Sequence, residues 1–323
     1  MSRAILVRQT GDAGVMQLEE RELNAPGPGQ LRIRQSAVGV NFVDTYQRSG
    51  LYPMPVPFVP GNEGVGLVTA IGPDVAGFTV GDRVTYQGQV GAYAEERLLS
   101  AERAIAVPDG IADETVAAMM LKGMTAYYLL FKTWPLAAGE TILYHAAAGG
   151  VGLIACQWAR ALGARVIGTA GSAEKLALAK ANGCDEVINY RTEDFAARVR
   201  ELTDGRGVDV VYDGVGKDTF EKSLDCLRPR GLMVSFGNAS GPVSIADLGI
   251  LARKGSLYVT RPTGLHYYAR RDDLLEGANA LFDVVKSGKV QVDISKTYSL
   301  ADAVAAHQAL EGRQTTGSVV LLP

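Results

Sequence analysis

A glycine-rich turn at residues 145–152 is the first feature with clear chemical potential. The string HAAAGGVG places Ala147, Gly149 and Gly152 at the three positions of the G-x-G-x-x-G signature. An apolar segment, 141–145, precedes the turn and a helical pattern follows it. In this context the backbone N–H groups at a helix N-terminus can bind a pyrophosphate. We therefore predict a dinucleotide site here, although alanine takes the place of the first glycine.

The next apolar segment, 165–170, distinguishes between NAD and NADP. NAD sites place an Asp or Glu near the end of this strand to bind the ribose 2′-hydroxyl. Here the chain continues through Thr169 to Ser172 with no acid, and Lys175 follows in the first turn of a predicted helix. Tyr190 ends the third apolar segment. A cation and small donors favour a 2′-phosphate, so we expect NADPH. The alternative for Lys175 is a solvated helix lysine.

Six short apolar segments alternate with helical patterns from about residue 125 to residue 261. This alternation predicts a doubly wound parallel sheet of six strands, the count of a full dinucleotide-binding fold. The segments are 141–145, 165–170, 186–190, 208–213, 231–237 and 256–260.

The regions on either side predict a second, β-rich domain. The first third alternates short β-rich segments with explicit turns such as Pro26–Gly29 and Gly72–Asp74. After Arg261 the chain has two amphipathic helical patterns and a final strand-like SVVLLP, too little to form a domain alone. We therefore expect an α/β fold in which the nucleotide domain, 125–261, is inserted in a β-rich catalytic domain made of 1–124 and 262–323.

The bulk composition argues against several function classes. The net charge is −3 and no basic patch is visible, so neither a nucleic acid nor a membrane surface is an expected partner. No apolar run approaches the roughly 20 residues that span a bilayer. Cys156, Cys184 and Cys226 suit neither a disulfide framework nor a metal clamp. We expect a cytoplasmic protein in which Cys156 is a small buried apolar residue.

Several long strings resemble one known family over essentially the whole chain. They include NFVDTYQRSGLYP (41–53), PGNEGVG (60–66), YHAAAGGVGLIACQWA (144–159), RGLMVSFGNASG (230–241) and GSLYVTRP (255–262). The sequence is similar to the zeta-crystallin-like quinone oxidoreductases of the medium-chain dehydrogenase/reductase superfamily. The resemblance implies a Rossmann domain inserted in a GroES-like domain, and NADPH-dependent reduction of a quinone. Two alternatives remain: an enone or alkenal reductase on the same scaffold, and a non-catalytic NADPH-binding structural protein.

The same strings imply that zinc is not used. Zinc-dependent relatives carry a cysteine in C-H-x-D and a histidine in G-H-E, where this chain has Asn41 and Asn62. Neither asparagine is a usual zinc ligand, so no metal is expected. A quinone is already a strong acceptor, and its reduction needs alignment and polarisation of a carbonyl rather than a Lewis acid.

The resemblance also implies the site residues. Asn41 and Tyr52 would donate hydrogen bonds near the acceptor, and Tyr46 would lie beside the nicotinamide ribose. Asp44 is expected to be structural, because an unperturbed aspartate is ionised at neutral pH. The residues implied in cofactor binding are Lys122 and Thr125 near the pyrophosphate, Gly149, Gly150 and Val151 in the turn, Gly171, Ser172, Lys175 and Tyr190 at the 2′-phosphate, Phe236, Gly237 and Asn238 beside the nicotinamide, and Arg261 and Arg313.

Two further expectations concern the last predicted strand and the histidines. Residues 256–260 would form an apolar edge of the sheet, which favours a homodimer joined there. We expect structural roles for His145 and His307, whereas His266 has no assigned role.

Overall fold

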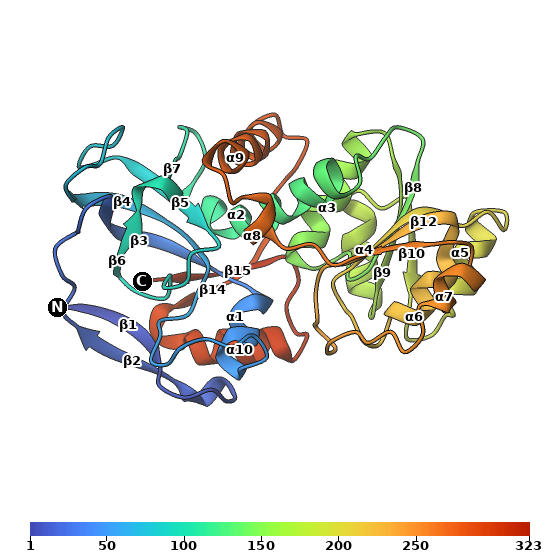
Figure 1. The fold of residues 1–323 in the computed structure, drawn as a ribbon, viewed down its shortest axis with the longest axis horizontal. Helices are drawn as coiled ribbons and strands as arrows, with labels where there is room; N and C mark the ends of the chain where they lie inside the picture. Colours follow the sequence, from blue (N-terminus) through green and yellow to red (C-terminus); the bar gives the residue numbers. More distant parts are fainter. The chain divides into compact units, whose positions relative to one another are not determined.

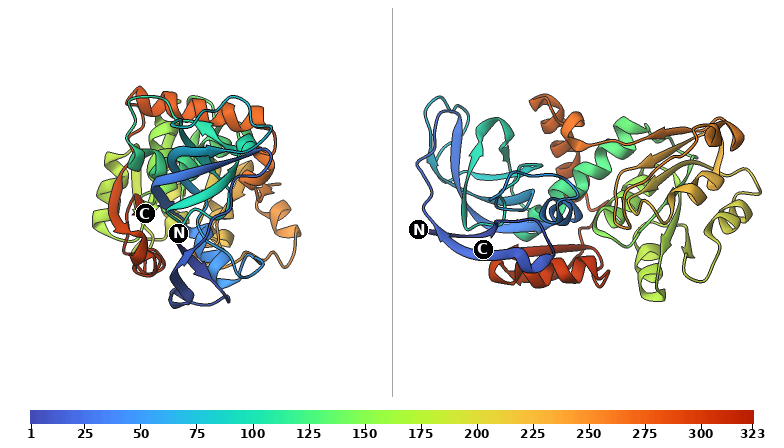
Figure 2. Two further views of the ribbon diagram at one scale, coloured as in Figure 1. Left: turned by 90° about the vertical axis from the view of Figure 1, so that its left-hand side faces the viewer. Right: turned by 60° about the horizontal axis from the view of Figure 1, so that its bottom comes forward.

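A computed structural model describes all residues, 1–323, as two compact units (Figure 1). Unit 1 contains residues 1–124, 268–286 and 292–323, and unit 2 contains residues 125–267 and 287–291. Both chain ends belong to unit 1, and the two views of Figure 2 show them on the same side of it. No helix in the chain combines the length and the apolar character needed to cross a bilayer.

Unit 2 is built on a six-stranded parallel sheet. The strand order is β10-β9-β8-β11-β12-β13, which is the doubly wound order 3-2-1-4-5-6 of a dinucleotide-binding fold. The predicted α/β fold with a parallel sheet is therefore confirmed. The strands are β8 (Thr141–Tyr144), β9 (Arg165–Ala170), β10 (Glu186–Asn189), β11 (Val208–Asp213), β12 (Leu227–Ser235) and β13 (Tyr258–Thr260).

Helices cover this sheet and explain its sequence pattern. Every residue of the central strands β8 and β11 is buried, because parallel sheets are covered on both faces and their strands are apolar runs. Helices α3 and α4 pack on β9, and α6 packs on β12. The helices of unit 2 are α3 (Gly150–Ala161), α4 (Ala173–Ala181), α5 (Phe195–Leu202), α6 (Phe220–Ser223), α7 (Gly249–Arg253) and α8 (Gly264–Tyr267), after a π-helical turn at Tyr128–Thr133.

Unit 1 contains the β-rich part of the chain. A seven-stranded sheet has the order β14-β15-β3-β4-β5-β7, with β6 paired to β3, and β1 and β2 form a separate antiparallel pair. The C-terminal strand therefore pairs with the first long strand of the chain. The strands are β1 (Ser2–Val7), β2 (Met16–Arg21), β3 (Gln30–Val40), β4 (Glu63–Ile71), β5 (Arg83–Gln87), β6 (Glu96–Ser100), β7 (Ile105–Ala106), β14 (Ile294–Ser299) and β15 (Ser318–Leu322).

Four helices complete unit 1, and three of them, α1, α2 and α10, position side chains discussed below. Helix α10, red in Figure 1, packs against α1, blue. The helices are α1 (Phe42–Ser49), α2 (Asp113–Tyr127, whose last three residues belong to unit 2), α9 (Arg271–Lys286) and α10 (Ala303–Glu311).

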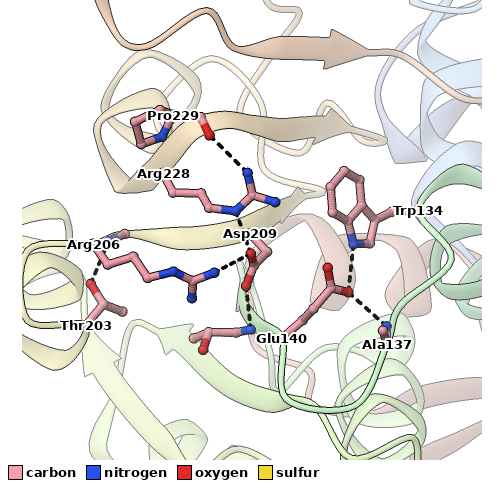
Figure 3. Close-up of polar contacts among 10 residues, drawn as sticks. Trp134, Ala137, Glu140, Thr203, Arg206, Asp209, Arg228 and Pro229 are labelled. Atoms are coloured by element: carbon pink, nitrogen blue, oxygen red, sulfur yellow. Dashed lines mark hydrogen bonds and ion pairs between the residues drawn. The ribbon is translucent and has the colours of Figure 1, made fainter.

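A buried aspartate, Asp209, joins three strands of unit 2 near their N-terminal ends. The Oδ1 atom of Asp209 accepts hydrogen bonds from Arg228 Nε at 2.6 Å and Arg206 Nη2 at 2.7 Å, and Oδ2 accepts from Thr141 N at 2.9 Å (Figure 3). Burial by itself would raise the pKa of Asp209. The hydrogen bonds from Arg228 and Thr141 and the two guanidinium charges outweigh burial and hold that pKa below its ordinary value. Beside this cluster, Glu140 accepts from the Trp134 indole.

We expect Asp209→Asn to lower the free energy of unfolding by about 1–3 kcal/mol at neutral pH, because two guanidinium groups lose a charged partner. Thermal denaturation should show a fall in Tm of a few degrees. Since the pKa is depressed, this contribution is complete above the pKa of an unfolded aspartate and is lost as the pH falls through the folded value. The difference should therefore narrow in acid. The exposed Asp218→Asn is the control, and equal Tm values for both variants would contradict the role.

Candidate active site

The predicted phosphate turn joins β8 to α3 in unit 2. Its left-handed residue is Ala146, with φ 53°, and Gly149 precedes the first turn of α3. No side chain caps this end of the helix, so its backbone N–H groups and the positive end of its dipole are available to an anion. Ala147 does not have positive φ, which explains why alanine is accepted where the signature has glycine.

Glycines keep this turn close to the sheet. A Cβ atom on Gly152 would lie 2.5 Å from Ala146 O and 2.7 Å from Ala147 O, so this position of the signature requires glycine. A Cβ on Gly168 in β9 would lie 2.9 Å from the Cβ of Ala147. The missing side chain at Gly168 therefore makes room for the methyl group of Ala147.

Three of the residues expected at a 2′-phosphate lie directly after β9 and β10, namely Gly171, Ser172 and Tyr190, and Lys175 follows in α4. The Oγ of Ser172 caps α4 by accepting from Lys175 N at 3.3 Å. A Cβ on Gly171 would lie 2.5 Å from the Tyr190 hydroxyl and 3.1 Å from Arg191 Nε. Gly171 thus allows a phenol and a guanidinium to approach the end of β9, and no acidic residue stands between Thr169 and Ser172. This donor set fits a phosphate better than a ribose hydroxyl.

Arg191 was missed in the sequence analysis. A signal was present, because Arg191 directly follows Tyr190 at the end of the third predicted strand. Its guanidinium is recognised as part of this corner only through the packing against Gly171.

The carboxyl end of β12 brings together the other residues implied in unit 2. Asp213 Oδ1 accepts from Val215 N at 2.7 Å and Gly216 N at 3.1 Å, which fixes the turn after β11. Gly237 packs directly against this turn, where a side chain would collide with Gly214 O. Arg261 Nη1 donates to Ser235 O at 2.7 Å and to Gly237 O at 3.2 Å. Phe236, Gly237, Asn238 and Arg261 therefore lie at one end of the sheet.

In unit 1, Asn41 belongs to a buried charged cluster. Asn41 Nδ2 donates to Glu63 Oε1 at 2.7 Å, and Lys122 Nζ donates to the same oxygen at 2.7 Å. Glu63 Oε2 accepts from Leu121 N at 2.6 Å. Glu63 is 0% exposed and Lys122 5%. The structure thus pairs Lys122, expected near the pyrophosphate, with the carboxylate that orients the Asn41 amide.

Asp44 and Asn62 form a second buried polar group at the start of α1. Asp44 Oδ2 accepts from Asn41 N at 2.8 Å and Oδ1 accepts from Asn62 Nδ2 at 2.6 Å. Asn62 Nδ2 also donates to Gln47 Oε1 at 2.8 Å. Burial raises the pKa of Asp44 to about 6, against the hydrogen bonds from Asn62, Asn41 and Tyr93. The premise that Asp44 has an unperturbed pKa was therefore wrong.

Tyr46 and Tyr52 are also brought together in unit 1. Their ring centroids are 5.2 Å apart with the rings at 63°, and Tyr52 N donates to Tyr46 O at 3.0 Å. Both side chains are partly exposed. Asn41 stands directly before α1 and Tyr46 lies within it, so one short helix positions two of the three predicted catalytic residues.

Two histidines and all three cysteines are buried. His145 hydrogen-bonds Thr169 Oγ1 and Ser223 Oγ, each at 2.9 Å, and burial lowers its pKa. His307 lies inside unit 1. A hydrogen bond with Cys184, together with burial, raises the pKa of the Cys156 thiol, so Cys156 is buried as expected but has a sulfur neighbour that its spacing did not suggest.

The structure divides the predicted site residues between the units. Unit 1 holds Asn41, Tyr46, Tyr52, Lys122 and Arg313. Arg313 follows α10 with φ 57°. The remaining predicted residues lie in unit 2, namely Thr125, Gly149, Gly150, Val151, Gly171, Ser172, Lys175, Tyr190, Phe236, Gly237, Asn238 and Arg261.

Comparisons with known proteins identify the family. The alcohol dehydrogenase GroES-like domain model matches residues 27–134, and the zinc-binding dehydrogenase model matches 150–287. A quinone oxidoreductase of Pseudomonas aeruginosa is 52% identical, and the match covers 100% of both chains. The chain belongs to the quinone oxidoreductase family. This assignment confirms the resemblance to the medium-chain dehydrogenase/reductase superfamily and the Rossmann and GroES-like fold class.

Two other relatives of this family are informative. The crystal structure of Escherichia coli quinone oxidoreductase complexed with NADPH superposes with a TM-score of 0.98 at 49% identity, covering 100% of both chains. A 2-haloacrylate reductase of a Burkholderia species is 49% identical and covers 100% of this chain and 99% of its own. Chains this similar thus carry names that refer to two different acceptors.

We expect Lys122→Met to destabilise the protein strongly, by about 3–5 kcal/mol, because it leaves the Glu63 charge buried without a cation. The double variant Lys122→Met/Glu63→Gln removes both charges and should recover a large part of the loss. Thermal melting of the parent, both single variants and the double variant gives the coupling between the two sites. If the two single losses simply add, the ion pair does not hold this cluster together.

Proposed function

We propose that this protein is an NADPH-dependent quinone oxidoreductase. The observation that carries the proposal is that the full chain is 52% and 49% identical in sequence to two proteins named quinone oxidoreductase. One of them was crystallised with NADPH. We further propose that the two domains expected from the sequence have separate functions. Residues 125–261 bind the dinucleotide, and residues 1–124 with 262–323 provide the groups that bind the acceptor.

The residues of unit 2 fit NADPH. The uncapped N-terminus of α3, with Gly149, Gly150 and Val151, would bind the pyrophosphate. The corner formed by Ser172, Lys175, Tyr190 and Arg191 would bind the 2′-phosphate, and the end of β12 with Arg261 would border the nicotinamide. When bound, the cofactor supplies a hydride. The chain supplies orientation and a shielded, polar surrounding for that transfer.

Residues of unit 1 would orient the acceptor. Glu63 holds the Asn41 amide through Nδ2, which leaves the second Nδ2 hydrogen of Asn41 for another partner. We propose that Asn41 and Tyr52 hydrogen-bond near the quinone carbonyl and that Tyr46 supports Tyr52. Hydrogen bonds aimed at an oxygen that gains negative charge stabilise the transition state.

We also propose that the reaction does not use zinc. Asn41 and Asn62 occupy the two positions at which zinc-dependent relatives have ligands. Both amides are hydrogen-bonded to carboxylates. The Glu63 carboxylate that binds Asn41 also binds the Lys122 ammonium. Elemental analysis of the purified protein should find no stoichiometric zinc.

Reduction of a conjugated carbon–carbon double bond is the second candidate. It is favoured by the 2-haloacrylate reductase relative, which is as similar to this chain as some of the quinone oxidoreductases are. The same polar groups would then hold a carbonyl or carboxylate conjugated to the double bond.

An acceptor panel tests the proposed function. Steady-state oxidation of NADPH and NADH is measured with no acceptor, with benzoquinones and naphthoquinones, and with enones and haloacrylates. We expect turnover with NADPH and quinones to exceed that with enones. Preferential turnover of enones or haloacrylates would favour the second candidate. NADPH binding without turnover of any acceptor would indicate a non-catalytic structural protein.

We expect Lys175→Ala to raise the KM for NADPH by roughly ten- to a hundredfold, because a charge-assisted hydrogen bond to a phosphate is lost. The KM for NADH should change little, since NADH has no 2′-phosphate. Lys180→Ala on the same helix is the control, because the Lys180 ammonium bonds Asp185 O rather than this corner. Equal effects on both cofactors would remove Lys175 from the phosphate site.

We propose in addition that the protein is a cytoplasmic homodimer joined through residues 256–260. Strand β13 is the last strand of its sheet. Tyr258 is 60% exposed there, and an uncovered edge strand favours pairing with a second copy. The mass in solution at micromolar concentration tests the dimer, and a monomer would refute it.

A further inference from the structure

Asp44, near the start of α1, is an acidic residue that is completely buried. Three donors surround its carboxylate. Asn62 Nδ2 lies 2.6 Å from Oδ1, and Asn41 N at 2.8 Å and the Tyr93 hydroxyl at 2.9 Å both reach Oδ2. All three are donors to an ionised carboxylate.

No cation balances this carboxylate. The two buried cations nearby are committed to other acids, Arg48 to Glu311 and Lys122 to Glu63. Glu63 itself faces Asp44 and opposes its ionisation. Burial, partly offset by the three hydrogen bonds, places the pKa of Asp44 at about 6. The group therefore changes charge close to neutral pH.

The hydroxyl of Tyr93 connects Asp44 to α10. It lies 3.0 Å from His307 Nε2 as well as 2.9 Å from Asp44. Burial and the charge of Arg48 lower the pKa of His307 to about 3, so this imidazole is neutral. When Asp44 is ionised, Tyr93 donates to it, and the hydrogen of His307 must lie on Nε2. The buried His307 Nδ1 then has no partner in the structure.

Protonation of Asp44 reverses this chain. The new hydrogen needs an acceptor, but the Asn62 side-chain NH2 and the Asn41 backbone N–H both donate to this carboxyl group. The Tyr93 oxygen can accept it, provided that Tyr93 turns its own hydrogen to His307 Nε2. The imidazole must then carry its hydrogen on Nδ1. One added proton thus changes the direction of two hydrogen bonds and the tautomer of His307.

We propose that Asp44 is the positioning residue of this site and that its ionisation determines, through its contacts with Asn41 and Asn62, whether the site is in its active arrangement, while the hydrogen bonds of Tyr93 and His307 reverse in step with it. Ionised Asp44 fixes the backbone of Asn41 and the amide of Asn62. Protonated Asp44 weakens both contacts, so turnover falls in acid. This inference rests on the proposed role of Asn41 in binding the acceptor.

The stability of the protein does not explain this arrangement. A carboxyl whose pKa is higher in the folded state than in the unfolded chain works against folding as the pH rises from about 4 to about 6, and the full penalty applies at neutral pH. Such a group is usually retained for function rather than for stability.

Other titratable groups around Asp44 set the context for its titration. Arg48 lies on α1 itself, Glu63 on β4, Tyr93 in the segment before β6, and His307 on α10. Arg48 is paired with Glu311, and Glu63 is paired with Lys122 of α2.

The first test follows kcat/KM for quinone reduction between about pH 5 and pH 8 in the parent and in Tyr93→Phe. The parent should lose activity as the pH falls through about 6. Tyr93→Phe removes one donor to the ionised carboxylate and should move this acid limb up by about half to one pH unit, a three- to tenfold change in the acid constant. Tyr86→Phe is the matched control, because the buried Tyr86 hydroxyl bonds Gln35 instead. An unmoved limb in Tyr93→Phe would overturn the proposal.

The second test needs no turnover. Infrared difference spectra recorded across the same pH range report a buried carboxyl group as it gains its proton. Asp44→Asn should abolish that signal, and Tyr93→Phe should move its midpoint in the same direction as the acid limb. A signal that persists in a folded Asp44→Asn would overturn the proposal, and so would the absence of any such signal from the parent.

The two tests also separate this inference from the proposed function. If the parent reduces no quinone but the carboxyl titrates as described, the proposed function fails while the ionisation of Asp44 stands. If the parent is active and its acid limb does not respond to Tyr93→Phe, the inference alone fails.

Discussion

Two buried carboxylates, Asp44 and Glu63, impose the strongest constraint on unit 1. A charge removed from water must be surrounded by donors or a cation, otherwise its desolvation is too unfavourable. Glu63 meets this need with Lys122, the Asn41 amide and a backbone N–H, and Asp44 meets it with three donors and no cation. Helices α1, α2 and α10 must therefore bring their polar side chains to this region.

Unit 2 depends on a different constraint, the close approach of backbone to backbone. At Gly152, Gly168 and Gly237 a side chain would strike a neighbouring segment. These contacts hold the turns after β8 and β12 near the carboxyl ends of the strands, where open α/β sheets bind ligands. The Asp209 cluster stabilises the opposite, N-terminal ends of the strands in the same sheet. The proposed binding residues and the Asp209 cluster therefore lie at opposite ends of the strands.

Local patterns predicted much of the fold because they record burial directly. The uninterrupted apolar strands 141–144 and 208–213 follow from a sheet covered on both faces. Helix α2 had no such signal, because its residues are apolar on nearly all sides and show no amphipathic period. Helix α1 was missed because it has only eight residues, although Asn41 and Asp44 stand at capping positions.

For the site, residue types alone predicted the dinucleotide turn and the preference for a 2′-phosphate. These conclusions need only the chemistry of a few neighbouring side chains. The tertiary structure decided which distant residues share a hydrogen bond. It paired Lys122 with Glu63, placed Arg191 beside Gly171, and enclosed Asp44 with Tyr93 and His307. A shifted pKa depends on burial and on partners far apart in the chain, so the sequence near Asp44 could not reveal it.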